Sequence, residues 1–235
     1  MNLENVRMLE LATEHLGDLL AEVVFVGGAT VELWITDEAA SEFRPTDDID
    51  VIVEITTLKE YHRFEERVRE VGFENDQQSG VICRFKHPGS GLVLDVMPTE
   101  TSILGFENRW QGEAFPHAAD VALPSGQSIR AIPPPYLLAT KLEAFRTRGN
   151  DDFYGSRDFG DVVALIDGRE ELPAEMAASP APLREYISGQ LNGLSGHPAF
   201  YSGLEGALPS GPETQARVEL VIRPRIAAIV GDERQ

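Results

Sequence analysis

The segment from Gly27 to Asp50 constrains the fold of this chain more than any other. A short apolar run at 23–26 leads into Gly27 and Gly28, and Asp48 and Asp50 follow later at the start of a β-branched run. Alternate residues of a strand point to the same face, so the two carboxylates lie on one side, roughly 6–7 Å apart at the backbone. Two acids at this separation can hold a divalent metal, and a nearby glycine turn can bind phosphate. The segment is typical of a metal-dependent nucleotidyl-transfer site.

The composition is that of an ordinary globular protein. The chain has 235 residues, of which 42% are apolar and 25% charged, so it is long enough to bury a core. No apolar run approaches the ~20 residues that span a bilayer, and the N-terminus has no apolar signal core. Cys83 is the only cysteine, which excludes an intrachain disulfide. We therefore expect a cytoplasmic protein without membrane contact.

The formal net charge of −19 bears on the choice of substrate. Binding to a phosphate backbone is driven by Lys and Arg, so this charge argues against a broad nucleic-acid-binding surface. A carboxylate-rich metal site tolerates a negative field, because bound cations invert the local charge. A small, locally basic cleft remains compatible with the sequence.

The hydrophobic patterning of the first part of the chain predicts alternating helices and strands. We expect helices at 3–20, 30–34 and 58–71, and strands at 23–26, 48–54, 81–85, 92–97, 119–123 and 128–132. The run His-Pro-Gly-Ser-Gly at 87–91 predicts a hairpin connection. These elements indicate an α+β fold, a mixed sheet flanked by helices.

Three consecutive prolines, Pro133 to Pro135, are the strongest break in composition. We place a domain boundary there, between a nucleotidyltransferase domain at 1–132 and a helical domain at 136–235. The second domain is predicted to contain helices at 136–148, 156–167, 181–190 and 214–230, the last with a break near Pro224.

A third acid, Asp95, lies inside the apolar strand predicted at 92–97. A lone charge there is costly unless it is paired or bound to metal. If this strand lies beside the one that carries Asp48 and Asp50, three carboxylates converge. Such a triad fits two-metal catalysis, in which the ions clamp the attacking and leaving oxygens at phosphorus. Mg²⁺ is the expected metal, because hard oxygen ligands favour it.

Other polar groups are candidates for binding the nucleotide. The turn that contains Gly27, Gly28 and Thr30 offers backbone amides and a hydroxyl to a triphosphate. Lys141 is the one cation on an otherwise apolar helix face and can neutralise pyrophosphate, although snorkelling surface lysines are more common. Arg157 and Asp158 open the next predicted helix, with Asp161 three residues on. They either position the substrate and Lys141 or form a surface ion pair with a capping acid.

Four sequence blocks together resemble the AbiEii/AbiGii-type toxin nucleotidyltransferases, within the DNA polymerase beta-type nucleotidyltransferase superfamily. The blocks are Gly-Gly-Ala-Thr at 27–30, Arg-Pro-Thr-Asp-Asp-Ile-Asp at 44–50, Lys-Leu-Glu-Ala-Phe-Arg at 141–146 and Arg-Asp-Phe-Gly-Asp at 157–161. The resemblance covers roughly residues 20–170 and implies a nucleotidyltransferase fold.

The resemblance also implies roles for individual residues. The acids that match Asp48 and Asp50 bind metal in that family, the third acid, here Asp95, activates the acceptor hydroxyl, and the lysine that matches Lys141 contacts the triphosphate. The same blocks place Thr46, Arg157 and Asp158 in the nucleotide-binding set. Several members transfer nucleotides from an NTP to tRNA acceptor ends and act as the toxic half of a toxin–antitoxin pair.

Our leading hypothesis is a Mg²⁺-dependent enzyme that transfers a nucleoside monophosphate from an NTP to an acceptor hydroxyl and releases pyrophosphate. The acceptor is tRNA or a small molecule, and the partner protein is an antitoxin. A second hypothesis is a small-molecule nucleotidyltransferase of the aminoglycoside-modifying kind, which the acidic charge favours. A third is a non-catalytic module that binds a nucleotide or a partner.

Overall fold

A computed structural model describes residues 3–105 and 108–231 of the chain. The chain folds into two compact units. The first consists of Met1–Leu33 and Arg44–Pro133, and the second of Trp34–Phe43 and Pro134–Gln235. No helix in the described part is long and apolar enough to cross a membrane.

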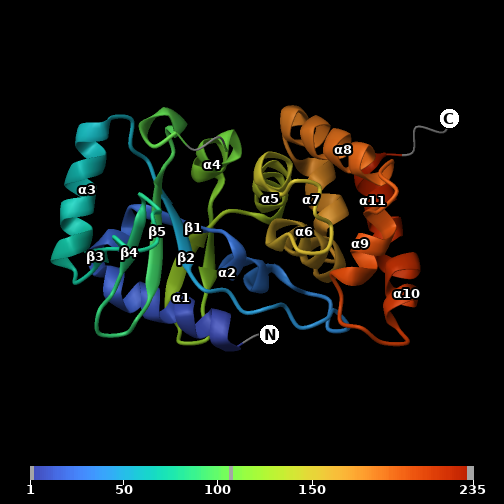
Figure 1. The fold of residues 1–235 in the computed structure, drawn as a ribbon, viewed down its shortest axis with the longest axis horizontal. Coiled ribbons are helices and arrows are strands. Elements are labelled where there is room, and N and C mark those ends of the chain that lie inside the picture. The colour runs from blue at the N-terminus through green and yellow to red at the C-terminus, as the bar shows by residue number, and fades with distance from the viewer. Residues whose placement is uncertain (1–2, 106–107, 232–235) are drawn as a thin grey trace. The chain divides into compact units, whose positions relative to one another are not determined.

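The first unit is built on a seven-stranded mixed sheet with the strand order β3-β4-β5-β2-β1-β7-β6 (Figure 1). The strands are β1 (Val23–Val26), β2 (Ile49–Val53), β3 (Glu74–Asn75), β4 (Arg84–Lys86), β5 (Val93–Pro98), β6 (Ala119–Ala122) and β7 (Ser128–Ala131). β2 is antiparallel to β1 and parallel to β5, and β7 is parallel to β1. The sheet and its helices confirm the predicted α+β fold.

The central strands of this sheet are the ones with the clearest sequence signal. All four residues of β1 are buried, and four of the five in β2 are as well, which explains their continuous β-branched character. The strand predicted at 81–85 was wrong at its start, since β4 begins at Arg84. Residues 81–83 form a turn instead, in which the Arg84 amide donates to the Val81 carbonyl at 3.2 Å.

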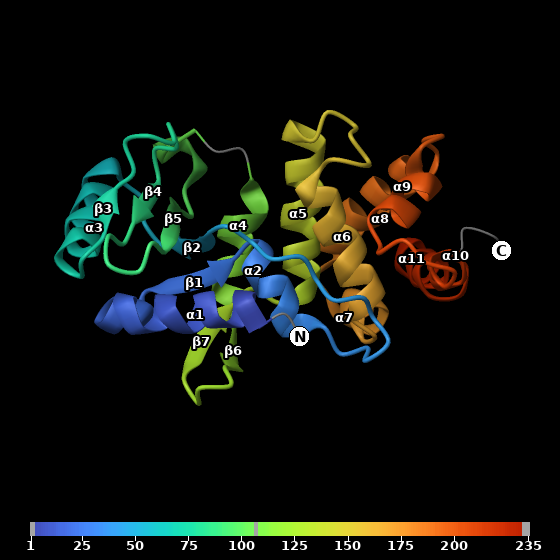
Figure 2. The same cartoon turned by 60° about the horizontal axis from the view of Figure 1, so that its bottom comes forward.

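Within the described residues, the first unit has the α-helices α1 (Leu3–Leu16), α2 (Gly28–Val31), α3 (Leu58–Glu70) and α4 (Arg109–Ala114). α1 crosses the sheet near β1 and β2 (Figure 2). It is shorter than the predicted helix at 3–20 because Gly17 adopts a φ of +52° and a 3₁₀ turn follows. A capping box between Thr57 and Glu60 starts α3, and the Tyr61 hydroxyl donates to the Val96 carbonyl at 2.9 Å, which fastens this helix to β5.

The second unit is helical, as predicted. Its helices are α5 (Pro134–Arg148), α6 (Arg157–Gly168), α7 (Leu172–Ala178), α8 (Ala181–Ser195), α9 (Phe200–Gly206), α10 (Thr214–Arg217) and α11 (Arg223–Val230). α7 and α9 were not predicted, because each is only seven residues long. The expected irregularity near Pro224 is a π-helical stretch, Val218–Ile222, which joins α10 to α11. Proline cannot donate a helical hydrogen bond, and a π turn accommodates the loss.

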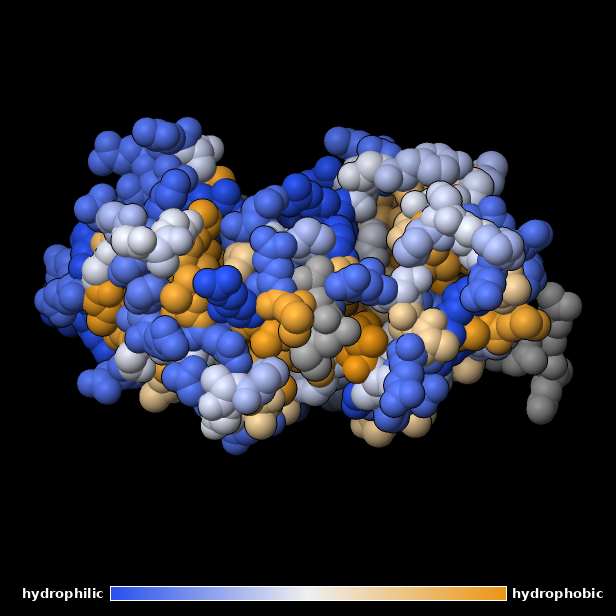
Figure 3. All heavy atoms as spheres, turned by 90° about the horizontal axis from the view of Figure 1, so that it is seen from below, coloured by the Kyte–Doolittle hydropathy of each residue, from blue (hydrophilic) through white to orange (hydrophobic). Residues whose placement is uncertain are grey.

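The second unit holds residues 34–43 through its own helices. The amides of Thr36 and Asp37 donate to the Gly168 carbonyl at 2.8 and 2.9 Å, at the end of α6. An aromatic cluster forms part of the core of this unit, and its members are Phe145, Phe153, Phe159 and Phe200. Large exposed apolar side chains in the described residues are few and dispersed, and the face in Figure 3 shows apolar patches separated by hydrophilic residues. Such scattered residues are normal for a protein surface.

Candidate active site

The three predicted acids come from two neighbouring strands of the sheet. Asp50 lies in β2 and Asp95 in β5, and the two are register partners on these parallel strands. Asp48 directly precedes β2. Paired residues of adjacent strands project to the same face, so Asp50 and Asp95 lie side by side. The neighbouring strands that the sequence argument required are therefore present.

Gly27 lies directly against Asp50. The two meet because Val26 and Asp50 are register partners, so the turn after β1 runs past the Asp50 side chain. A Cβ added at Gly27 would lie 1.9 Å from Asp50 Oδ2, and the glycine has a φ of +79°. Both the space and the backbone conformation therefore require glycine at this position. Gly27 therefore lets the chain turn beside the Asp50 carboxylate.

Arg84, which we did not predict, joins two of the three acids. Its Nε and Nη2 atoms donate to the two oxygens of Asp95 at 2.8 and 2.7 Å, a bidentate pair. The same Nη2 donates to Asp48 Oδ2 at 2.5 Å. Arg84 is the register partner of Asp95 on β4, so the strand pairing itself brings the guanidinium to the acid. Charge-assisted bonds of this kind are stronger than neutral ones.

The carboxylates dominate the electrostatics around these strands. The hydrogen bonds and charge of Asp95, with smaller contributions from Asp48 and Asp50, raise the pKa of Arg84 well above its usual range. Burial, with Asp95 and Asp50 nearby, raises the pKa of the Cys83 thiol to about 12. Cys83 is therefore an un-ionised buried thiol at neutral pH.

A chain of hydrogen bonds fixes the approach to β2. The Thr46 hydroxyl donates to Asp48, at 3.3 Å to its carbonyl and 3.4 Å to Oδ1. The Thr46 amide in turn donates to Asn5 Oδ1 at 2.9 Å, and Asn5 Nδ2 donates to the Arg44 carbonyl at 3.0 Å. Asn5 is fully buried on α1 and was missed from the sequence. Thr46 thus acts here on the orientation of Asp48, and its contact with a nucleotide stays a prediction.

Thr30 stabilises the glycine turn from within. Its hydroxyl donates to the Gly27 carbonyl at 2.9 Å, and the residue is fully buried. Gly28 is the first residue of α2, and Gly27 is its N-cap. The first amides of a helix have no partner inside that helix, which is the general basis of phosphate binding at such turns. The phosphate-binding roles of Gly27, Gly28 and Thr30 stay predictions.

The remaining predicted residues belong to the second unit. Lys141 on α5 is buried, and its Nζ lies 2.6 Å from Asp161 Oδ2 and 3.6 Å from Asp158 Oδ1, both on α6. Arg148 donates to both oxygens of Asp158, at 2.8 and 3.0 Å. Arg157 is the exposed first residue of α6. The sequence left two interpretations of this group, substrate positioning or a surface ion pair. Both acids are buried, Asp161 at 0% and Asp158 at 7% exposed, so they do not form a surface pair.

The charge balance of Asp158 follows from these contacts. Burial disfavours its ionised form, but the hydrogen bonds from Arg148 and the charges of Lys141 and Arg148 outweigh burial and lower its pKa. The buried acids Asp158 and Asp161 are therefore matched by two cations, the buried Lys141 and the mostly exposed Arg148. Lys141 is engaged by both acids, and its assignment to a triphosphate stays a prediction.

The donor chemistry of the first unit suits Mg²⁺. Asp48, Asp50 and Asp95 supply hard carboxylate oxygens on adjacent strands, which are the ligands that this ion prefers. Among the residues that the structure describes, no group of three or more His, Cys, Asp or Glu side chains is already arranged around a metal position. The residue types fit the ion, while Arg84 bonds to two of the three acids.

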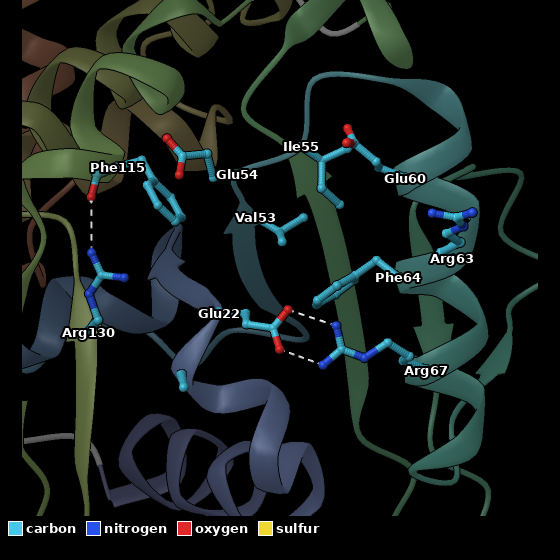
Figure 4. A pocket seen from close by; sticks show the side chains of 11 residues that line it. Glu22, Val53, Glu54, Ile55, Glu60, Arg63, Phe64, Arg67, Phe115 and Arg130 are labelled. Atoms are coloured by element: carbon cyan, nitrogen blue, oxygen red, sulfur yellow. Dashed lines mark hydrogen bonds and ion pairs between the residues drawn. The ribbon is translucent and has the colours of Figure 1, made fainter.

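A separate cavity of about 510 Å³ lies at the opposite end of β2, beyond Val53 (Figure 4). Three arginines and three glutamates line it. Arg67 forms a bidentate ion pair with Glu22, at 2.5 and 2.7 Å. Arg130 donates to the Phe115 carbonyl. The charges of this cavity are balanced, and none of the predicted site residues lines it.

The sequence contained a signal for Arg84 that we did not use. The hairpin turn at 87–91 pairs the His87 amide with the Leu92 carbonyl at 2.8 Å. Counting back along both strands from that turn places Arg84 opposite Asp95, as the register shows. Asn5 had no comparable signal, because its partners lie about forty residues away in the chain.

The sequence profile of one protein family matches residues 11–189, which is more than half of the chain. That family is described as "Nucleotidyl transferase AbiEii toxin, Type IV TA system". The match includes all three acids, the glycine turn and the Lys141 cluster. No curated protein is significantly similar to the chain in sequence.

Proposed function

The chain belongs to the AbiEii nucleotidyl transferase toxin family of type IV toxin–antitoxin systems, and from this premise we propose that it is a Mg²⁺-dependent nucleotidyltransferase that modifies tRNA. It transfers a nucleoside monophosphate from an NTP to an acceptor hydroxyl. The acceptor oxygen forms a bond to the α-phosphorus, the bond from that phosphorus to the bridging oxygen breaks, and pyrophosphate leaves.

One observation supports this proposal above the others, which is the register pairing of Asp50 with Asp95 beside Gly27. Carboxylates on adjacent strands next to a glycine turn are what metal-assisted transfer at phosphorus needs. A sheet holds them more rigidly than loops would, so little reorganisation is required when the substrate binds.

Each residue has a defined role in the proposal. Asp48 and Asp50 hold Mg²⁺, which neutralises charge on the phosphates, and Asp95 completes the site and accepts the proton of the attacking hydroxyl. The turn at Gly27 and Gly28 seats the phosphates through its amides. Thr46 keeps Asp48 oriented through the hydrogen bonds described above.

The acceptor and the partner follow from the family. Its type IV toxin–antitoxin description supports an antitoxin as the partner protein. The resemblance of the four sequence blocks to enzymes that modify tRNA acceptor ends supports tRNA as the acceptor. Lys141, Arg157 and Asp158 remain assigned to the nucleotide by that resemblance.

The test offers the purified chain each α-³²P-labelled NTP with Mg²⁺ and either tRNA, an aminoglycoside or no acceptor. We expect label in tRNA together with released pyrophosphate. Asp48→Asn should lower the rate at least about 100-fold, since the loss of one charge-stabilising group costs this much. Asp47→Asn is the matched control, because it removes the same charge from the adjacent exposed residue and should retain activity.

The outcomes separate the proposed function from its alternatives. Label in the aminoglycoside alone would replace tRNA by a small cationic acceptor, which the net charge of −19 favours. Absence of pyrophosphate with every acceptor would indicate a non-catalytic binding module. Equal loss in Asp48→Asn and Asp47→Asn would contradict the assignment of Asp48 to the metal.

A further inference from the structure

Arg84 occupies a position that the proposed mechanism does not use. Its side chain bonds to three carboxylate oxygens, two on Asp95 and one on Asp48. The three side chains are half-buried or buried, with 23% of Arg84, 25% of Asp48 and 10% of Asp95 exposed. Partial burial reduces screening by solvent, so these pairs are stronger than surface ion pairs.

The contacts of Arg84 concern the same oxygens that a metal would need. Both oxygens of Asp95 accept from the guanidinium, and Asp48 Oδ2 accepts from its Nη2 atom. A divalent ion bound by these oxygens would lie next to a fixed positive charge. Two cations in a partly buried site repel each other, and the guanidinium cannot lose its proton to relieve the repulsion.

Arg84 and a divalent ion do not fully exclude each other, because the acids carry more negative charge than Arg84 neutralises. Asp48 and Asp95, the two acids that Arg84 contacts, carry two negative charges, and Arg84 compensates one of them. The remaining charge still attracts a divalent ion, but less strongly than the two acids would without Arg84. Arg84 therefore affects how tightly the ion binds without preventing its binding.

We propose that Arg84 is a positioning residue that competes with divalent cations for Asp48 and Asp95 and thereby sets the cation affinity of the site. In the nucleotide-free protein, Arg84 holds both acids in place and keeps the affinity low. Arg84 would release Asp48 when a divalent ion enters with the nucleotide. This inference rests on the proposed function, because it assumes that these acids are the metal ligands.

The test measures Mn²⁺ binding to the full chain without nucleotide, by titration with electron paramagnetic resonance detection of the free ion. Mn²⁺ takes the same oxygen ligands as Mg²⁺ and is directly observed. We expect Arg84→Gln to bind Mn²⁺ about tenfold more tightly than the wild type, because one like charge is removed next to the ion. Arg63→Gln is the matched control, since it removes an equal charge from an exposed position of α3 and should leave the affinity unchanged.

A second variant keeps the test decisive if Arg84→Gln does not fold. Arg84→Lys retains the charge but loses the planar fork that bonds to two carboxylates at once. We expect it to bind Mn²⁺ about threefold more tightly than the wild type. Unchanged or weaker binding in the folded Arg84 variants would overturn the inference.

Two further variants separate failure of this inference from failure of the proposed function. Asp48→Asn and Asp50→Asn should both lose Mn²⁺ binding if these acids are the ligands. If they lose it while Arg84→Gln binds no more tightly, only the competition by Arg84 is wrong. If neither aspartate variant changes Mn²⁺ binding, the metal site itself is wrong, and the proposed function fails with it.

Discussion

The Arg84 cluster of the first unit and the cluster around Arg217 and Arg225 in the second differ in their charge balance. In the first unit, the Arg84 guanidinium donates hydrogen bonds to both Asp95 and Asp48. The backbone of Asp50 pairs with that of Asp95. In the second unit, Arg217 forms ion pairs with Asp37 and Asp167, and Arg225 forms one with Asp37, at distances of 2.5–3.2 Å. The first cluster therefore has an excess of acids, whereas the second is balanced.

The difference in charge balance indicates a structural role for the cluster around Arg217 and Arg225. The arginines of the balanced cluster also donate to the carbonyls of Ile166 and Asp167, near the end of α6. Every charge there has an internal partner, and the cluster connects residues 34–43 to the helices. An unbalanced cluster retains attraction for an outside cation. The balanced cluster is a structural network, whereas the excess of acid in the first cluster fits the metal-binding role proposed for it.

The largest effect is expected at the glycine turn beside the unbalanced cluster. Gly27→Ala places a Cβ 1.9 Å from Asp50 Oδ2 and must move that carboxylate. A displacement near 1 Å costs roughly 100-fold in rate, so we expect at least that loss in nucleotidyl transfer, measured with labelled NTP. Gly80→Ala is the control, because Gly80 has a similar φ of +72° but no atom within 4 Å of its added Cβ. Equal rates in the two variants would contradict the contact with Asp50 as the reason for glycine at position 27.

The next effect concerns stability and contrasts the clusters directly. Asp167→Asn removes a charge from the balanced cluster, where Asp167 is 2% exposed, and leaves Arg217 without that partner. We expect the free energy of unfolding to fall by about 3 kcal/mol. Asp48→Asn removes one of the excess acids and should change it by less than about 1 kcal/mol. Urea denaturation followed by circular dichroism measures both, and comparable losses would remove the distinction between the clusters.

The smallest effect is the acid sensitivity of the second unit. The pKa of Asp158 is lowered in the folded protein, so its contribution is fully present above the unfolded value of ~3.9 and is lost as the pH falls through the lower folded value. We expect the urea midpoint to fall below about pH 4. Arg148→Gln should weaken this dependence by less than ~1 kcal/mol, since Arg148 is 71% exposed. An identical pH profile in the variant would mean that burial and Lys141 alone control Asp158.

The parts of the fold that the sequence predicted well are those with strong local patterns. The strand at 23–26, the hairpin at 87–91 and the helix at 58–71 each have their own apolar period and their own start or stop signal. Short elements such as α7 and α9 have too few residues to show a period. The residues at 81–83 are apolar, so their sequence resembles that of a strand. They form a turn instead, in which Cys83 is buried.

The sequence by itself determined which residues are candidates for the site, because the spacing of Asp48 and Asp50 and the glycine before them are local properties of strand and turn. Only the tertiary structure decided which polar groups meet across the fold: Arg84 with Asp48, Asn5 with the loop before β2, and Lys141 with Asp161. These partners are distant in the chain, and strand register and helix packing bring them together. The balance of charge at each cluster depends on that packing, so it is a property of the folded protein and not of any single motif.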